Sequence, residues 1–142
     1  MPAERTPFAL LPLAVVVGFS MLMAFSNYGA PFPFLGIIYE GGAAKFLAFT
    51  DSLISLYLLI GVLKRQQLTV WLLMAYNLFD ICNAWINLAI IPIEEYAKLA
   101  AVAVSEDDLR FNTLFATVIV VLLNLYLFRI RRQFDNRSPY LF

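Results

Sequence analysis

Four apolar runs divide the chain, and each is about as long as a helix that crosses a lipid bilayer. They cover residues 8–27, 44–63, 68–91 and 109–129. A helix rises about 1.5 Å per residue, so about 20 residues span a hydrocarbon core about 30 Å thick. Hydrophobic residues make up 62% of the 142 residues and charged residues only 14%, against about 25% charged in a typical soluble domain. The runs therefore predict an all-α integral membrane protein with a single transmembrane domain over residues 1–142.

The first run has a second interpretation. The stretch MPAER followed by apolar residues has the order of a secretory signal, with a charged start and an apolar continuation. The run is longer than the apolar part of a usual signal, and its cleavage site is poor. We therefore expect it to be the first of four spans.

The connections and the charges predict how the spans are arranged. Short connections favour consecutive antiparallel helices, as in a four-helix bundle, and the tightest turn lies at 64–67. Both chain ends and this turn share one side, which holds Arg5, Lys64, Arg65, Arg129, Arg131, Arg132 and Arg137. The opposite loops hold only Lys45, Lys98 and Arg110. Because basic residues collect in cytoplasmic loops, we expect a multi-pass protein of the cell inner or plasma membrane with both termini cytoplasmic.

The two outer connections carry signals of their own. Loop 27–43 contains two prolines and several aromatic residues, so we expect an interfacial or shallow re-entrant segment, or a lid over a cavity between helices. After Pro92 we expect a short helix along the membrane surface, with Glu94 able to pair with Lys98 one turn later. Ser105 is a candidate N-cap for the last span.

The third run contains a polar stripe. At about 100° per residue, its four polar members fall within one third of the circumference of a helix. They are Asn77, Asp80, Asn83 and Asn87. Asp51 and Ser55 share a face of the second run, and Asn124 lies on a weaker stripe of the fourth. Each stripe avoids lipid best by turning toward the other helices.

The two aspartates are the most costly of these residues in a membrane. Counted from the outer ends of their runs, Asp51 and Asp80 lie at roughly 10–12 Å and 15–17 Å, and thus at similar depths. No lysine or arginine of any run lies at that depth, so at least one carboxyl must be protonated or held by amides, hydroxyls, water or a cation. We therefore predict a ligand- or ion-binding site. Its expected members are Asp51, Asp80, Asn77, Asn83, Asn87, Asn124 and Ser55.

A structural role competes with this prediction. Asparagine side chains also hold membrane helices together, and each such hydrogen bond contributes about 0.6 kcal/mol on average. We favour that role for the asparagines. For Asp80 we favour a functional role, because asparagine or serine would meet a purely structural need at lower cost.

The residue types exclude several classes of function. The chain has no histidine, which removes histidine-based catalysis, haem ligation by histidine and the commonest metal ligand. The single Cys82 forbids an intrachain disulfide and is expected to be buried among apolar residues. We expect no cofactor and no metal site. The basic residues flank membrane segments, so we expect no nucleic-acid partner.

Three functions stay open. The leading hypothesis is a non-enzymatic protein that binds a partner membrane protein or a small amphipathic ligand within the bilayer, around Asp80 and Asp51. The alternative is a small homo-oligomeric transporter or channel that couples to protons or cations through the same carboxylates. The third is a membrane enzyme that acts on a lipid or a quinone, for which the chain lacks a nucleophile motif.

Two passages resemble small bacterial four-span inner-membrane proteins of unknown function. LIGVLKRQQLTVWLL, residues 59–73, is similar to the glycine, basic turn and tryptophan that often join the middle spans of such proteins. LYLFRIRRQF, residues 125–134, looks like the aromatic and basic exit of their last span. The passages cover under a fifth of the chain. The resemblance implies a topology, and it implies no activity and no site residue.

Overall fold

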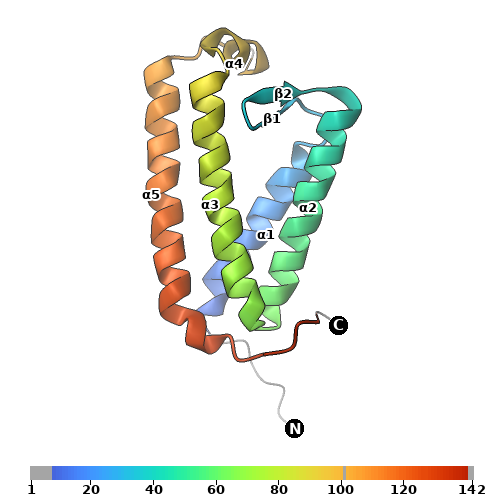
Figure 1. Cartoon of the computed structure of the whole chain (residues 1–142), viewed down its shortest axis with the longest axis vertical. Coiled ribbons are helices and arrows are strands. Elements are labelled where there is room, and N and C mark those ends of the chain that lie inside the picture. Colours follow the sequence, from blue (N-terminus) through green and yellow to red (C-terminus); the bar gives the residue numbers. More distant parts are fainter. Residues whose placement is uncertain (1–7, 101, 141–142) are drawn as a thin grey trace.

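The chain folds mostly into helices (Figure 1). The structure is a computed structural model, and it describes residues 8–100 and 102–140. The helices are α1 (Leu10–Ser26), α2 (Gly41–Leu63), α3 (Gln67–Ile90), α4 (Ile93–Ala100) and α5 (Glu106–Ile130), and a 3-10 turn follows at Arg131–Gln133. Two short antiparallel strands, β1 (Phe32–Phe34) and β2 (Ile37–Tyr39), lie between α1 and α2.

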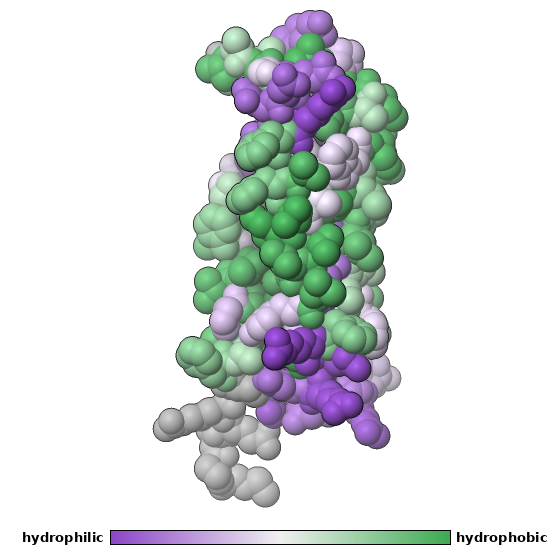
Figure 2. All heavy atoms as spheres, turned by 90° about the vertical axis from the view of Figure 1, so that its left-hand side faces the viewer, coloured by the Kyte–Doolittle hydropathy of each residue, from purple (hydrophilic) through white to green (hydrophobic). Residues whose placement is uncertain are grey.

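The helices fit a membrane protein. In the described part of the chain, α2 and the helical stretch Glu106–Gln133 are each long and apolar enough to cross a bilayer, and α3 together with α4 makes a third candidate with a bend of 112° between them. Helix α1 is apolar but only 17 residues long. Figure 2 shows a broad apolar band on the face that α5 presents, with hydrophilic residues at both ends. The predicted helical membrane protein is confirmed at this level.

The helices pack as two pairs that meet at one end. Helix α1 lies against α2, and α3 lies against α5. At the end with the turn between α2 and α3, here called the lower end, a buried apolar core joins the pairs. Its members are Leu10, Leu13, Val17, Leu58, Val62, Val70, Leu73, Leu127, Ile130 and Phe134. Toward the upper end α2 and α3 diverge, and the β-hairpin lies between them (Figure 1).

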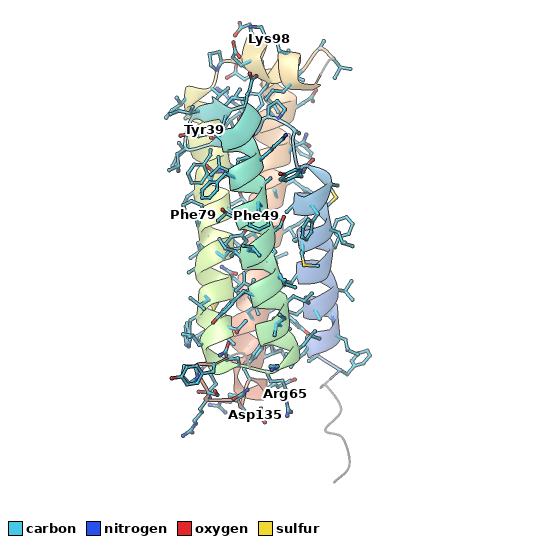
Figure 3. All side chains as sticks on the ribbon, turned by 90° about the vertical axis from the view of Figure 1, so that its right-hand side faces the viewer. Tyr39, Phe49, Arg65, Phe79, Lys98 and Asp135 are labelled. Carbon is cyan, nitrogen blue, oxygen red and sulfur yellow. The ribbon has the colours of Figure 1, made fainter. Side chains whose placement is uncertain are left out.

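The segment after α5 closes the lower end. Phe134 enters the core, and Asn136 then lies beside the α2–α3 turn. The N–H of Gln67 donates to the carbonyl of Asn136 over 2.8 Å, and the N–H of Asn136 donates to the carbonyl of Arg65 over 3.1 Å. Arg65 also pairs with Asp135 at 3.5 Å (Figure 3). The tail thus fixes the turn by backbone bonds.

The hairpin was not predicted. Loop 27–43 was expected to lie in the interface, to re-enter the membrane or to form a lid, and strands were not among these alternatives. The pairing of Phe34 with Ile37 leaves a two-residue turn, Leu35 and Gly36, with φ angles of 49° and 83°. Two positive φ angles are what a tight turn of the I′ type requires. Glycine adopts such an angle freely. Leucine rarely does, so Leu35 did not indicate a tight turn in the sequence.

Two smaller predictions were wrong, and a third, the N-cap at Ser105, was right in position only. Helix α4 does follow Pro92, but Lys98 pairs with Glu95, three residues earlier, at 3.1 Å and not with Glu94. Ser105 precedes α5, yet its side chain makes no capping hydrogen bond, and its backbone carbonyl accepts from the N–H of Leu109 instead. Cys82 is exposed because it lies on the outward face of α3.

Candidate functional site

Two asparagines of the polar stripe hold the β-hairpin on α3. Asn83 Oδ1 accepts a hydrogen bond from the N–H of Leu35 over 2.8 Å, and Asn87 Oδ1 accepts one from the N–H of Gly36 over 2.7 Å. Asn87 Nδ2 also donates to the carbonyl of Pro33 over 3.3 Å. The turn would otherwise leave these backbone groups without partners in an apolar region. The two side chains therefore act as anchors for the hairpin.

Two further asparagines join α3 to α5. Asn77 Nδ2 donates to Asn124 Oδ1 over 2.9 Å, and Asn124 Nδ2 lies 3.4 Å from the carbonyl oxygen of Met74. Higher on the same pair of helices, Trp85 Nε1 donates to Thr117 Oγ1 over 2.9 Å. These contacts match the structural role that we favoured for the asparagines.

A cavity of about 410 Å³ lies among α1, α2, α3 and α5. Its lining is mostly apolar, with Val16, Leu73 and Leu123 among the residues that form it. Polar side chains also reach it from α1, α2 and α3, and from the residue after α1. These are Ser20, Asn27, Asp51, Ser55, Asn77 and Asp80.

A second cavity, of about 280 Å³, lies under the hairpin between α2 and α3. Phe32 and Phe34 of β1 and Phe79 of α3 form much of its wall, and the ring centroids of Phe34 and Phe79 are 5.9 Å apart. Figure 3 shows Phe79 at mid-height of the bundle, below Tyr39 of the hairpin. Asp51, Asp80 and Tyr76 line this cavity as well as the larger one. The two cavities therefore adjoin at the aspartates.

The two aspartates make no hydrogen bond or ion pair with any described residue. Asp51 is half-buried, and Asp80 is exposed toward the cavities. No lysine or arginine is among the described residues that line either cavity. Of the side chains predicted to form a site, Asp51, Asp80, Ser55 and Asn77 line the larger cavity, and Asn83 lines the smaller one with the aspartates. Asn87 and Asn124 line neither cavity, and all four asparagines are also engaged by the hairpin or across the α3–α5 pair.

Ser55 differs from the other hydroxyl residues around it. It is only 3% exposed and lines the larger cavity, yet its hydroxyl makes no hydrogen bond in the described part of the chain. Ser20, Thr50 and Ser52 instead donate to the backbone carbonyl one turn earlier in their own helices. The Ser55 hydroxyl is thus left for a group inside the cavity.

Sequence reasoning missed the aromatic residues beside the aspartates. Tyr76 lies at the edge of the polar stripe of α3, and Phe79 lies three residues further on. Residues three apart lie on the same side of a helix. That spacing was visible in the sequence. Phe32 and Phe34 could not be placed, since their position depends on the hairpin.

The comparisons add no assignment to this geometry. Matching against protein-family models, curated proteins and solved structures finds nothing similar to this chain. Among the described residues, no three His, Cys, Asp or Glu side chains gather as a metal site would require. The function is therefore argued from the cavities and their lining.

Replacing Asn87 by alanine is expected to loosen the hairpin. The change removes both bonds of the side chain, to Gly36 and to Pro33, and a bond of this kind contributes about 1 kcal/mol. The Gly36 amide should then exchange its hydrogen roughly tenfold faster, as measured by NMR. Asn112→Ala, on the exposed side of α5, should leave that rate unchanged. Equal protection in both variants would show that the asparagine does not hold the hairpin.

Proposed function

We propose that the chain is a four-span membrane protein that binds a small amphipathic ligand within the bilayer. The observation that carries the proposal is the cavity of about 410 Å³ between the helix pairs. Its size falls within the range of about 300–1,000 Å³ that is typical of small-molecule sites. Such sites are mostly apolar and have a few polar groups that fix orientation. The apolar lining around Asp51, Ser55 and Asp80 has this composition.

Four spans account for the surface better than two or three. Helix α1 has 17 residues, which is at the short end of the range of about 17–25 for a span, and it exposes large apolar side chains such as Phe19 and Leu22. A helix with this surface is stable beside α2 only if lipid covers its outer side. We assign α4, which carries charged residues along one side, to the outer membrane surface.

Charge supports both termini in the cytoplasm of a cell inner or plasma membrane. Basic residues gather at the lower end of the molecule. In the described part these are Lys64, Arg65, Arg129, Arg131, Arg132 and Arg137. Acidic residues instead flank the upper ends of the helices, as at Glu40, Glu94, Glu95, Glu106, Asp107 and Asp108. Basic loops remain on the cytoplasmic side during insertion.

A ligand fits this site better than a partner membrane protein does. The polar groups without partners line cavities between helices of this chain. The outward faces carry residues such as Phe111, Leu114 and Phe115, and these suit lipid contact as well as they suit a protein partner. The cavity therefore favours a small molecule, and no enzymatic step is needed to account for it.

One observation favours the alternative of a proton- or cation-coupled transporter. Asp51 and Asp80 line both cavities, so a proton or cation bound at either carboxyl would be accessible from both cavities. Protonation changes the cost of exposing a carboxyl to an apolar region. Reconstituted vesicles that show ion- or pH-driven flux above protein-free controls would establish this second function.

Photolabelling tests ligand binding at the cavity. A decyl alcohol that carries a diazirine group should label Val120 and Leu123, which line the cavity, in a way that saturates and is competed by unmodified decyl alcohol. Labelling of Phe115 on the outward face should rise without saturation. The protein is held in lipid nanodiscs, and the labelled residues are located by mass spectrometry.

Variants that fill the cavity supply the control. Ser55→Leu, and independently Val16→Trp, should remove the saturable labelling, because both residues line the cavity. Ser26→Leu, at the exposed end of α1, should retain it. Labelling that is the same in all four proteins would count against a ligand site in the bundle.

A further inference from the structure

We propose that the ligand is an organic cation, with an ammonium-like group placed between Asp51 and Asp80 and an apolar body in the larger cavity. The inference rests on the ligand-binding function proposed above and adds the chemical class of the ligand. Three observations carry it: two carboxyls without partners, a serine hydroxyl that opens to the cavity without a hydrogen bond, and aromatic rings that line the same cavities. The residues concerned lie in α2, in α3 and in the hairpin.

The carboxyl pair calls for a positive charge. A carboxylate in an apolar region is costly unless it is paired or hydrogen-bonded, and Asp51 and Asp80 meet no such partner among the described residues. Basic side chains are missing from the described lining of both cavities. A cation brought by the ligand would therefore supply the charge that the protein does not.

The lining favours an organic cation over a bare metal ion. Calcium takes about six to eight oxygen ligands and magnesium about six, whereas the described residues provide two carboxyls and mostly apolar walls. An alkyl or aromatic body would fill the apolar part of the cavity, around Leu73 and Leu123. A bare ion would instead lose its hydration there without gaining enough polar partners from the apolar walls. The composition of the cavity thus matches a molecule with one charged end.

Aromatic side chains line the same cavities as the aspartates. Tyr76 lines both cavities, as the aspartates do, and Phe34 and Phe79 stand in the smaller cavity with ring centroids 5.9 Å apart. The face of an aromatic ring attracts a cation within about 6 Å of its centre, and the attraction is stronger where water is excluded. Aromatic rings beside carboxylates are a usual means of holding alkylated ammonium groups.

The Ser55 hydroxyl adds direction. Ser55 is only 3% exposed, and it lines the cavity one helical turn below Asp51. The hydroxyl oxygen is reached from the cavity, and a polar group of the ligand would give it the hydrogen-bond partner that the described residues do not supply. Ser55 therefore marks the side on which the charged end of the ligand lies.

Two probes of nearly equal shape test the inference. Decyltrimethylammonium carries a fixed positive charge, and decyldimethylamine N-oxide is its uncharged counterpart, with an oxygen in place of one methyl group. Both are titrated by calorimetry into the full chain in nanodiscs of zwitterionic lipid, with protein-free nanodiscs as blank. The unaltered chain should bind the ammonium probe about tenfold more tightly than the N-oxide.

Variants assign this preference to residues. Asp51→Asn and Asp80→Asn should each reduce the preference to about threefold or less, because the ammonium group then loses one carboxylate. Tyr76→Leu should weaken ammonium binding by about threefold. Asp108→Asn, an exposed carboxylate at the start of α5, should keep the full preference. Circular dichroism of each variant in nanodiscs reports whether it is folded.

The outcomes separate the two proposals. Saturable binding of both probes with equal affinity would overturn the organic-cation inference and leave the ligand-binding function standing. A preference that survives in both asparagine variants would also overturn it, because the charge would then be recognised elsewhere. Saturable binding of neither probe would overturn the ligand-binding function itself.

Discussion

Replacing Phe134 by alanine is expected to lower the free energy of unfolding by about 3–5 kcal/mol. Phe134 is 1% exposed and belongs to the buried core at the lower end of the bundle. Alanine would leave a cavity there, and the surrounding helices would close it only in part. The backbone bonds of Asn136 with Arg65 and Gln67 follow two residues later, so the tail should also detach. Chemical unfolding in nanodiscs or mild detergent measures the loss.

Phe46→Ala is the matched control for this prediction. Phe46 lies in α2 and is 68% exposed, so its ring faces outward. Its removal should change the free energy of unfolding by about 0.5 kcal/mol or less. If Phe134→Ala proves as mild as Phe46→Ala, then the tail does not pack into the core in the membrane.

Replacing Gly61 by alanine is expected to destabilise the protein by about 1–3 kcal/mol. Gly61 is buried where α2 meets α3, and an added Cβ would lie 2.8 Å from the Cβ of Thr69 and overlap its hydroxyl oxygen. Thr69 cannot easily turn aside, because it is fully buried and its hydroxyl donates to Gln66 Oε1 over 2.9 Å. The two helices would have to move apart, which disturbs the turn between them.

Two further variants make this prediction specific. Gly42→Ala, at the start of α2, meets nothing within 4 Å and should leave stability unchanged or slightly raised. Combining Gly61→Ala with Thr69→Ala should cost less than the sum of the two single changes, because the second change removes the hydroxyl oxygen and the methyl group that collide and leaves only the Cβ contact. Strictly additive costs would contradict a direct contact between the two positions.

The helices could be predicted from the sequence because the length and hydropathy of each apolar run determine where a span begins and ends. Helices α2, α3 and α5 begin and end within a few residues of the predicted runs, since a span of about 20 residues leaves little freedom. The end of α1 before the hairpin, and the helix after Pro92, also follow from local breakers. These features depend on neighbouring residues and need no knowledge of the rest of the chain.

The partners of the polar residues could not be predicted in the same way. The period of a helix placed Asn77, Asp80, Asn83 and Asn87 on one side of α3, but the rotation of each helix in a bundle is set by packing. Asn83 and Asn87 form hydrogen bonds with a hairpin that was not predicted from the sequence. The sequence separated Asp80 from its asparagine neighbours by its chemistry, and the structure adds that the asparagines have hydrogen-bond partners whereas Asp80 has none among the described residues.

The tail after α5 shows the same limit at longer range. From the sequence, Phe134 belongs to the aromatic and basic segment that ends the last span. No neighbouring residue indicates that its side chain enters the core. Its contacts depend on Leu10 and Val62, which lie far away in the sequence. Contacts of this kind follow from the assembled bundle.

Native mass spectrometry of the chain released from nanodiscs tests ligand binding within the bundle most directly. With increasing decyltrimethylammonium in zwitterionic nanodiscs, we expect one probe molecule per chain at saturation. Ser55→Leu and Val16→Trp should lose this adduct, and Ser26→Leu should keep it, as their places relative to the cavity require. Adducts that grow without saturation and are equal in all four proteins would contradict a ligand site between the helix pairs.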